Sequence, residues 1–273
     1  MSYNPDQIRS EFDEYGLREW ERLVANPIEE IGLHVHTVLL ERFVRPGMRV
    51  LEIGAGPGRF TQVLARLGAR VLVSDISPVQ LELNRRKAAE HGFAAAVSAW
   101  EEVDMCDLSR YADASFDMVL AYGGPFSYVL DHRSQALAEC MRVLQPGGVL
   151  LMSVMSLWGT IHFALKGVME TDPEFNRRII ASGDISPETF PRGRKYMHLF
   201  RSAELRDWLT NAGLTVEAMS ATRALSTGWG ELGDELRSSP DRWAELLAME
   251  VEACAEPGAL DMGTHIIAAA RKE

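Results

Sequence analysis

The sequence predicts an α/β fold in which helices cover both faces of a doubly wound, mostly parallel sheet. Short aliphatic runs recur along the chain, and most are followed by a helical pattern with its own start or stop signal. The first run leads directly into a cluster of glycines, as in ligand-binding turns between a strand and a helix. Regular alternation of strand and helix is typical of a parallel sheet buried between two layers of helices.

The aliphatic runs mark most of the predicted strands. In chain order they are residues 50–53, 71–73, 118–121, 149–154, 214–219 and 264–270. One more strand is expected to end just before Val103. Helices are predicted where capping residues stand: after Ser77, from Asp131 to the turn at Pro146, and from Ser202.

Two segments fall outside this alternation. For residues 1–44 the sequence predicts two helices, and the second begins with Asn26 as its N-cap and Pro27 at its first position. Residues 157–200 carry weak helical signals with glycine and proline breaks, and we expect them to form a lid over a ligand crevice. The predicted organisation is an N-terminal helical cap (1–44), a core (45–156 and 201–273) and the lid insertion (157–200).

Composition excludes several classes of protein. The 273 residues include 28 Lys and Arg against 39 Asp and Glu, a net charge of −11, which disfavours bulk binding to nucleic acid or to an anionic membrane. Cys106, Cys140 and Cys254 are widely spaced, so no disulfide framework and no zinc site are expected. The polar start of the chain lacks a signal-peptide pattern, and we expect a cytoplasmic monomer or homodimer.

The glycine turn has the pattern Glu52-x-Gly54-x-Gly56-x-Gly58. Glycines at such a turn let the backbone bend tightly and approach a ligand. The dinucleotide fingerprint would require a third glycine where Arg59 stands, and no Lys follows the glycines as in a phosphate-binding loop. A nicotinamide cofactor is therefore disfavoured, and hydrolysis of ATP or GTP is unlikely.

Acidic residues follow the next two strands. Asp75 ends the second strand, where a carboxylate can accept hydrogen bonds from both hydroxyls of a ribose. Asp104 follows the third, where it can accept from an adenine amino group while the backbone of Met105 meets a ring nitrogen. Each acid alone is better explained as a helix cap or loop turn, but the joint order of the acids along the chain indicates an adenosine ligand.

These motifs resemble those of the class I S-adenosylmethionine-dependent methyltransferase family. Phe116-Asp117-x-Val119 and the segment 142–148, Arg-Val-Leu-Gln-Pro-Gly-Gly, add to the likeness. The resemblance is strong over 45–156 and weak over 198–272. It implies a seven-stranded Rossmann-like sheet whose last strand is antiparallel, with S-adenosylmethionine across the carboxyl ends of the first four strands. By the resemblance, Gly54, Gly56 and Gly58 approach the methionine part, Asp75 holds the ribose, and Asp104 and Met105 frame the adenine. The full set of residues expected at the cofactor adds Tyr15 of the N-terminal helices and Glu52, Ala55, Ile76 and Ala121 beside the strand ends.

The acceptor site is expected beyond Tyr122-Gly123-Gly124, where the family transfers the methyl group. In-line transfer needs the acceptor held close to the methyl carbon with water excluded, and an oxygen nucleophile also needs a base. The candidate catalytic residues are Tyr122, His162, Tyr196 and His198. His34 and His36 lie two apart on a predicted helix and point away from one another, so no metal site is expected.

Three further questions stay open at this point. A nicotinamide-dependent oxidoreductase and a non-catalytic cofactor-binding module are the alternatives to a small-molecule methyltransferase. The basic cluster at residues 192–195 is suited to a carboxylate or phosphate, which would make the acceptor a small anionic metabolite. The alternative explanation of the cluster, and the simpler one, is a solvated surface loop.

Overall fold

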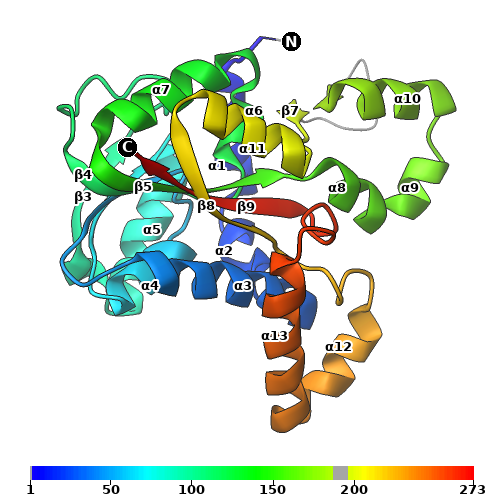
Figure 1. Ribbon diagram of the computed structural model, residues 1–273. Coiled ribbons are helices and arrows are strands. Elements are labelled where there is room, and N and C mark those ends of the chain that lie inside the picture. Colours follow the sequence, from blue (N-terminus) through cyan, green and yellow to red (C-terminus); the bar gives the residue numbers. More distant parts are fainter. Residues whose placement is uncertain (1, 187–195) are drawn as a thin grey trace.

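The computed structural model describes residues 2–186 and 196–273, and its centre is a seven-stranded sheet in the order β3-β2-β1-β4-β5-β9-β8 (Figure 1). The strands are β1 (Arg49–Ile53), β2 (Arg70–Asp75), β3 (Val97–Glu102), β4 (Phe116–Ala121), β5 (Leu144–Met155), β8 (Leu214–Ala221) and β9 (His265–Lys272). Strands β1 to β5 pair in parallel, whereas β9 runs antiparallel to both β5 and β8. The predicted doubly wound, mostly parallel sheet is confirmed.

Two helical layers cover the sheet (Figure 1). One layer buries its apolar side chains with α6 (Pro125–Tyr128), α7 (Arg133–Val143) and α11 (Ser202–Asn211). The other does so with α3 (Pro27–Phe43), α4 (Arg59–Arg66), α5 (Pro78–Glu90) and α13 (Pro240–Ala255). The central strands are therefore buried on both faces, which accounts for their uninterrupted aliphatic sequences.

The N-terminal segment forms three helices where the sequence predicts two. Gly16, at φ +55°, ends α1 (Pro5–Tyr15), and α2 (Arg18–Arg22) follows as a separate short helix. The side chain of Asn26 caps α3 as expected, because its Oδ1 accepts from the Glu29 N–H at 3.0 Å. The break between α1 and α2 lets the chain turn across the carboxyl edge of the sheet.

The segment after β5 projects from the same edge as three short helices (Figure 1). They are α8 (Leu157–Phe163), α9 (Leu165–Met169) and α10 (Pro173–Ser182), followed by the small sheet of β6 (Asp184–Ile185) and β7 (Met197–His198). Gly159 in α8 is a packing position, since a Cβ there would lie 1.6 Å from the carbonyl oxygen of Gly263. This contact ties the start of α8 to the loop before β9.

A second helical insertion, α12 (Gly230–Arg237) with α13, lies between β8 and β9. Glu250 of α13 is fully buried, and its carboxylate accepts from the N–H groups of Ala224, Leu225 and Ser226. These bonds fix the loop that carries Arg223. No helix in the described ranges is both long enough and apolar enough to cross a bilayer.

Candidate functional site

The glycine turn joins β1 to α4 at the carboxyl edge of the sheet. Gly54, Gly56 and Gly58 all have positive φ, at +62°, +53° and +101°, which other residues rarely adopt. A Cβ at Gly54 would lie 2.8 Å from the Pro125 ring, and one at Gly58 would lie 2.9 Å from the Asn84 amide nitrogen. Two of the three glycines are therefore also required by close packing.

A cavity opens beside this turn at the carboxyl edge of the sheet, where α/β proteins commonly bind small molecules. The carboxyl ends of β1, β2 and β4, together with the segment after β3, form its floor, as the sequence predicts. The lining includes Gly54, Ala55, Gly56 and Pro57 of the turn, Asp75 and Ile76 after β2, Val103 and Met105 after β3, and Tyr122 and Gly123 after β4. We call it the first cavity.

Asp75 is held rigidly at the edge of the first cavity. Its Oδ2 accepts from the Gly56 N–H and its Oδ1 from the Ser77 N–H, both at 2.8 Å. Burial raises the pKa of this carboxyl to about 6, although the two backbone N–H groups oppose the shift. Each oxygen of an ionised carboxylate keeps a further lone pair, so Asp75 can still accept from two vicinal hydroxyls.

The N-terminal helices α1 and α2 cover the first cavity at the carboxyl edge of the sheet. Gln80 of α5 donates to the Phe12 carbonyl at 2.9 Å, and Arg9 of α1 forms an ion pair with Glu102 at 3.0 Å. Arg59, which occupies the position of the missing third glycine, stacks over the Trp20 ring at 3.8 Å. Arg59 therefore holds α2 over the turn.

Several predicted cofactor residues lie behind or beside the first cavity. Glu52 is buried beneath the turn, where it accepts from the Thr61 hydroxyl at 2.7 Å, and burial raises the pKa of this carboxyl to about 8. Asp104 accepts from the Tyr3 hydroxyl at 2.9 Å, and the Ala121 side chain is buried in the sheet. Glu52, Gly58, Asp104 and Ala121 do not line the cavity wall, because packing and hydrogen bonds within the chain engage them.

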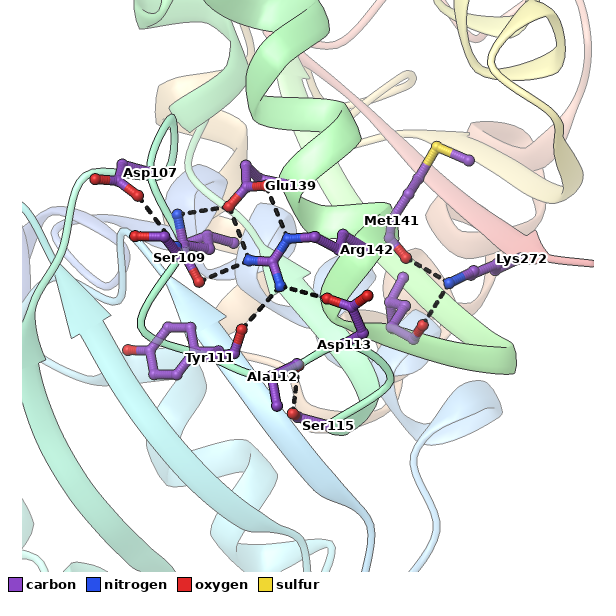
Figure 2. Close-up of polar contacts among 12 residues, drawn as sticks. Asp107, Ser109, Tyr111, Ala112, Asp113, Ser115, Glu139, Met141, Arg142 and Lys272 are labelled. Carbon is purple, nitrogen blue, oxygen red and sulfur yellow. Dashed lines mark hydrogen bonds and ion pairs between the residues drawn. The ribbon is translucent and has the colours of Figure 1, made fainter.

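The loop after β3 is fixed by Arg142 at the end of α7, as Figure 2 shows. The Arg142 guanidinium donates to the carbonyls of Leu108 and Tyr111 at 2.8 Å, and it binds Glu139 through two N–H groups at 2.9 Å. Glu139 in turn accepts from the Leu108 N–H at 2.9 Å. This network positions the segment that carries Met105.

A second cavity adjoins the first and shares Arg22, Leu23, Phe60 and Gly123 with it. Its other walls come from α3, the end of β5, α8, the segment after β8 and the start of β9. They are Glu29, Gly32, His36, Met155, Thr160, Phe163, Thr222, Arg223, Thr264 and His265. A third hollow is lined by Tyr15 together with Glu11, Tyr128 and Met155, and Tyr15 does not line the first cavity.

The predicted catalytic residues are not gathered at the junction of the two cavities. Tyr122 lines the first cavity, and burial raises the pKa of its phenol well above the usual value. His198 is buried between two carboxylates, with Nδ1 2.7 Å from Asp184 Oδ1 and Nε2 2.7 Å from Glu204 Oε1. His162 is exposed on α8, and none of His162, Tyr196 and His198 lines either cavity. The basic cluster 192–195 lies outside the described residues.

His36, His265 and Arg223 line the second cavity and were not among the predicted site residues. The signal for His36 was present in the sequence, because Ile28, Ile31, Val35 and Leu39 place an apolar stripe on its helix. A histidine within a buried stripe is a polar exception that requires a partner. Nothing local marks His265 or Arg223, since their places depend on how β8 and β9 join the sheet.

The sheet order, the glycine turn and Asp75 together define an α/β nucleotide-binding domain with its site at the carboxyl edge. Comparison with known proteins shows which proteins of this fold the chain is similar to. Residues 51–152 match the methyltransferase domain family. A ubiquinone biosynthesis O-methyltransferase of Xanthomonas oryzae pv. oryzae is 30% identical over 179 residues, which cover 64% of this chain and 65% of that protein. Methyltransferase GfsG of Streptomyces halstedii is 34% identical over 149 residues, or 53% of this chain and 51% of the relative.

A solved structure shares nearly the whole fold. It is a 1,6-didemethyltoxoflavin-N1-methyltransferase of Burkholderia thailandensis with bound S-adenosylhomocysteine, 18% identical, with a TM-score of 0.59 over 98% of this chain and 88% of that one. A methyltransferase domain therefore lies at residues 51–152, and the chain as a whole resembles the class I S-adenosylmethionine-dependent methyltransferases in fold. It spans 65% of the length of the ubiquinone biosynthesis O-methyltransferase that it matches.

Proposed function

We propose that this protein transfers the methyl group of S-adenosylmethionine to a small-molecule acceptor. One observation carries the proposal: a cavity that contains a glycine turn and a fixed carboxylate opens at Gly123 into a second cavity. A donor and an acceptor held in adjoining cavities can meet at such a junction without a covalent enzyme intermediate.

The residues of the first cavity fit the cofactor. At Gly56 a Cβ would be in ordinary van der Waals contact with the Glu19 side chain at 3.6 Å, so it is the positive φ of +53° rather than close packing that favours glycine there. Asp75 offers two carboxylate oxygens for the ribose, and the Met105 segment is available to the adenine. Tyr122 and Phe60 present aromatic rings on the wall near Gly123, and aromatic faces attract a cation such as a sulfonium. When bound, S-adenosylmethionine supplies an activated methyl group with a neutral thioether as leaving group.

The chain itself has to orient the acceptor and exclude water. Gly123 has no side chain and lies in all three hollows, so it leaves the passage between them open. Helices α1 and α2 cover the first cavity, while α8 contributes Thr160 and Phe163 to the wall of the second. In-line displacement depends on this positioning, because the reacting atoms must be held roughly 3 to 3.5 Å apart before reaction.

The acceptor's charge is a separate part of the proposal. An anionic metabolite was expected from the cluster 192–195. The described cavity offers two arginines, but each has a carboxylate partner: Arg22 pairs with Glu19 and Arg223 with Glu29 at 3.0 Å. These pairs leave little net charge for an anion, so we propose a polar but uncharged acceptor group in the second cavity.

The test is calorimetric titration with S-adenosylhomocysteine, followed by a methyl-transfer assay that detects this product. Binding with transfer to a small molecule would support the full proposal. Binding without transfer to any acceptor would indicate a non-catalytic cofactor-binding module. Absence of binding, with binding of a nicotinamide dinucleotide instead, would replace the proposal by an oxidoreductase.

A further inference from the structure

His36 is a deeply buried polar residue in the wall of the second cavity. Its side chain is 6% exposed, and its ring centroid lies 4.6 Å from that of Tyr122 and 5.2 Å from that of Phe60. Tyr122 and Phe60 also line the first cavity. His36 is therefore next to the place where the two cavities meet.

Hydrogen bonding fixes which ring nitrogen carries the proton. Nδ1 of His36 lies 2.8 Å from the Gly32 carbonyl oxygen, which can only accept, so Nδ1 is the donor. Nε2 then carries a lone pair, and it has no partner among the described residues although it is buried. An unfilled lone pair in such a place is unfavourable, so a donor on a bound molecule would be favoured there.

The surroundings keep this imidazole neutral. Burial lowers the pKa of His36 to about 4, and the nearby Arg22 and Arg223 lower it further, against the bond to Gly32. His265, whose ring centroid is 6.4 Å away, is also kept neutral, since burial lowers its pKa well below the usual value. The groups that face His36 are thus Tyr122, His265, Arg22 and Arg223, and none of them donates to Nε2.

We propose that Nε2 of His36 is the general base for an acceptor hydroxyl, and that the acceptor is a hydroxylated, largely apolar molecule such as a phenol. This inference rests on the proposed methyl transfer. Leu23, Phe60, Met155 and Phe163 supply apolar walls for the acceptor. The phenol of Tyr122, Nε of Arg223 and the hydroxyl of Thr160 are buried without described partners, and they are suited to a second oxygen.

The step balances. The acceptor O–H bond breaks and its proton moves to Nε2, while the oxygen forms a bond to the methyl carbon of the sulfonium donor. The carbon–sulfur bond breaks, and its electron pair stays on sulfur as a neutral thioether. One positive charge is lost at sulfur and one is gained at the imidazole, so the net charge of the cavity is unchanged. The imidazolium then releases its proton to water, which Arg22 and Arg223 favour by repulsion.

The free lone pair on Nε2 of His36 favours an oxygen acceptor over a nitrogen or sulfur acceptor. A neutral amine attacks before it loses a proton, and a thiol ionises readily without a base. A phenol or enol is a poor nucleophile until its proton is taken, so it gains most from a base within reach. General-base catalysis of this kind is worth about 10²- to 10⁴-fold in rate.

The experiment compares His36→Gln with His34→Gln, a matched change on the same helix at a half-buried site that lines neither cavity. Both variants and the wild type are titrated with S-adenosylhomocysteine and then assayed with matched phenols, anilines and thiophenols. We expect unchanged binding in all three proteins. His36→Gln should lose about 10²- to 10⁴-fold in kcat for phenols with KM changed only a few-fold. The loss should shrink for a nitrophenol that is already ionised in the assay.

A second measurement does not depend on turnover. In the S-adenosylhomocysteine complex of the protein with ¹⁵N-labelled histidine, added catechol should shift the Nε2 resonance of His36, assigned by its loss in His36→Gln. The His34 resonances should not move. Wild-type kcat in His36→Gln, transfer to anilines or thiophenols in preference to phenols, or an unmoved Nε2 resonance would overturn the assignment. Failure of the wild type to bind S-adenosylhomocysteine would instead overturn the proposed function.

Discussion

Asp75→Ala tests the cofactor site at its best-defined contact. The substitution removes the acceptor of two backbone N–H groups, those of Gly56 and Ser77, each at 2.8 Å. It also removes the two oxygens proposed for the ribose. A hydrogen bond to a charged group is worth about 1.5–3 kcal/mol, so losing the ribose contacts should weaken binding by at least that amount, roughly 10- to 150-fold in Kd.

The assay is calorimetric titration with S-adenosylhomocysteine. Asp107→Ala is the matched control, because Asp107 is an exposed loop acid that bonds only to Ser109 among the described contacts and does not line the first cavity. Wild-type affinity in Asp75→Ala, with normal folding, would refute the assignment of Asp75 to the cofactor. An equal loss in the Asp107 variant would show that the effect is not specific to the site.

The same carboxylate makes binding depend on pH. Burial raises the pKa of Asp75 to about 6, so the group takes up a proton as the pH falls through that value. A protonated carboxyl accepts more weakly from ribose hydroxyls, so affinity should be full above about pH 7 and should decline toward pH 5. Asp75→Ala should remove this slope, and a slope that persists in the variant would assign the titration to another group.

The remaining predictions concern stability. Burial raises the pKa of Glu52 to about 8 from an ordinary 4.5, so between these pH values the folded state holds a proton that the unfolded state does not. The free energy of unfolding should therefore fall as the pH rises from about 4.5 to 8. Urea titrations should show a flatter pH dependence for Glu52→Gln, and an unchanged pH dependence in this variant would contradict the reasoning. Arg142→Lys should lower the free energy of unfolding by about 1–3 kcal/mol and speed amide hydrogen exchange over residues 104–115, because an ammonium cannot make the several directed hydrogen bonds of the guanidinium. Unaltered exchange in these residues would argue against the network. Gly159→Ala should lower Tm, because the new Cβ would lie 1.6 Å from the Gly263 carbonyl oxygen, whereas Gly167→Ala, where no atom lies within 4 Å of the new Cβ, should not; equal Tm values in the two variants would count against that packing.

The parts of the fold that are fixed by local pattern were predictable. The strands at the centre of the sheet are buried on both faces and therefore appear as aliphatic runs. The edge strand β3 was expected only from the order of the motifs, because its residues are half-exposed and include Trp100 and two glutamates. The helices α12 and α13 were not predicted, because they lie outside the regular alternation of strand and helix on which the prediction was based.

The site divides in the same way. The glycine turn, Asp75 and Met105 lie within a few residues of strand ends, so chain order was enough to bring them to one cavity. The second cavity gathers α3, α8, β8 and β9, which are distant in sequence. His198 was a candidate base only because it is a histidine near the predicted lid. In the structure both of its ring nitrogens are engaged, one by Asp184 and the other by Glu204. Only tertiary packing brings His36 to Tyr122.

The most direct test of the account is a transfer assay with S-adenosylmethionine that carries a labelled methyl group, against a library of hydroxylated aromatic compounds. We predict that label appears in an organic product in amounts equal to the S-adenosylhomocysteine formed. We also expect Asp75→Ala to lower this yield at limiting cofactor and His34→Gln to leave it unchanged. Label that stays on the donor with every compound of the library, although the wild-type protein binds the donor, would contradict the claim that the two cavities form a methyl-transfer site.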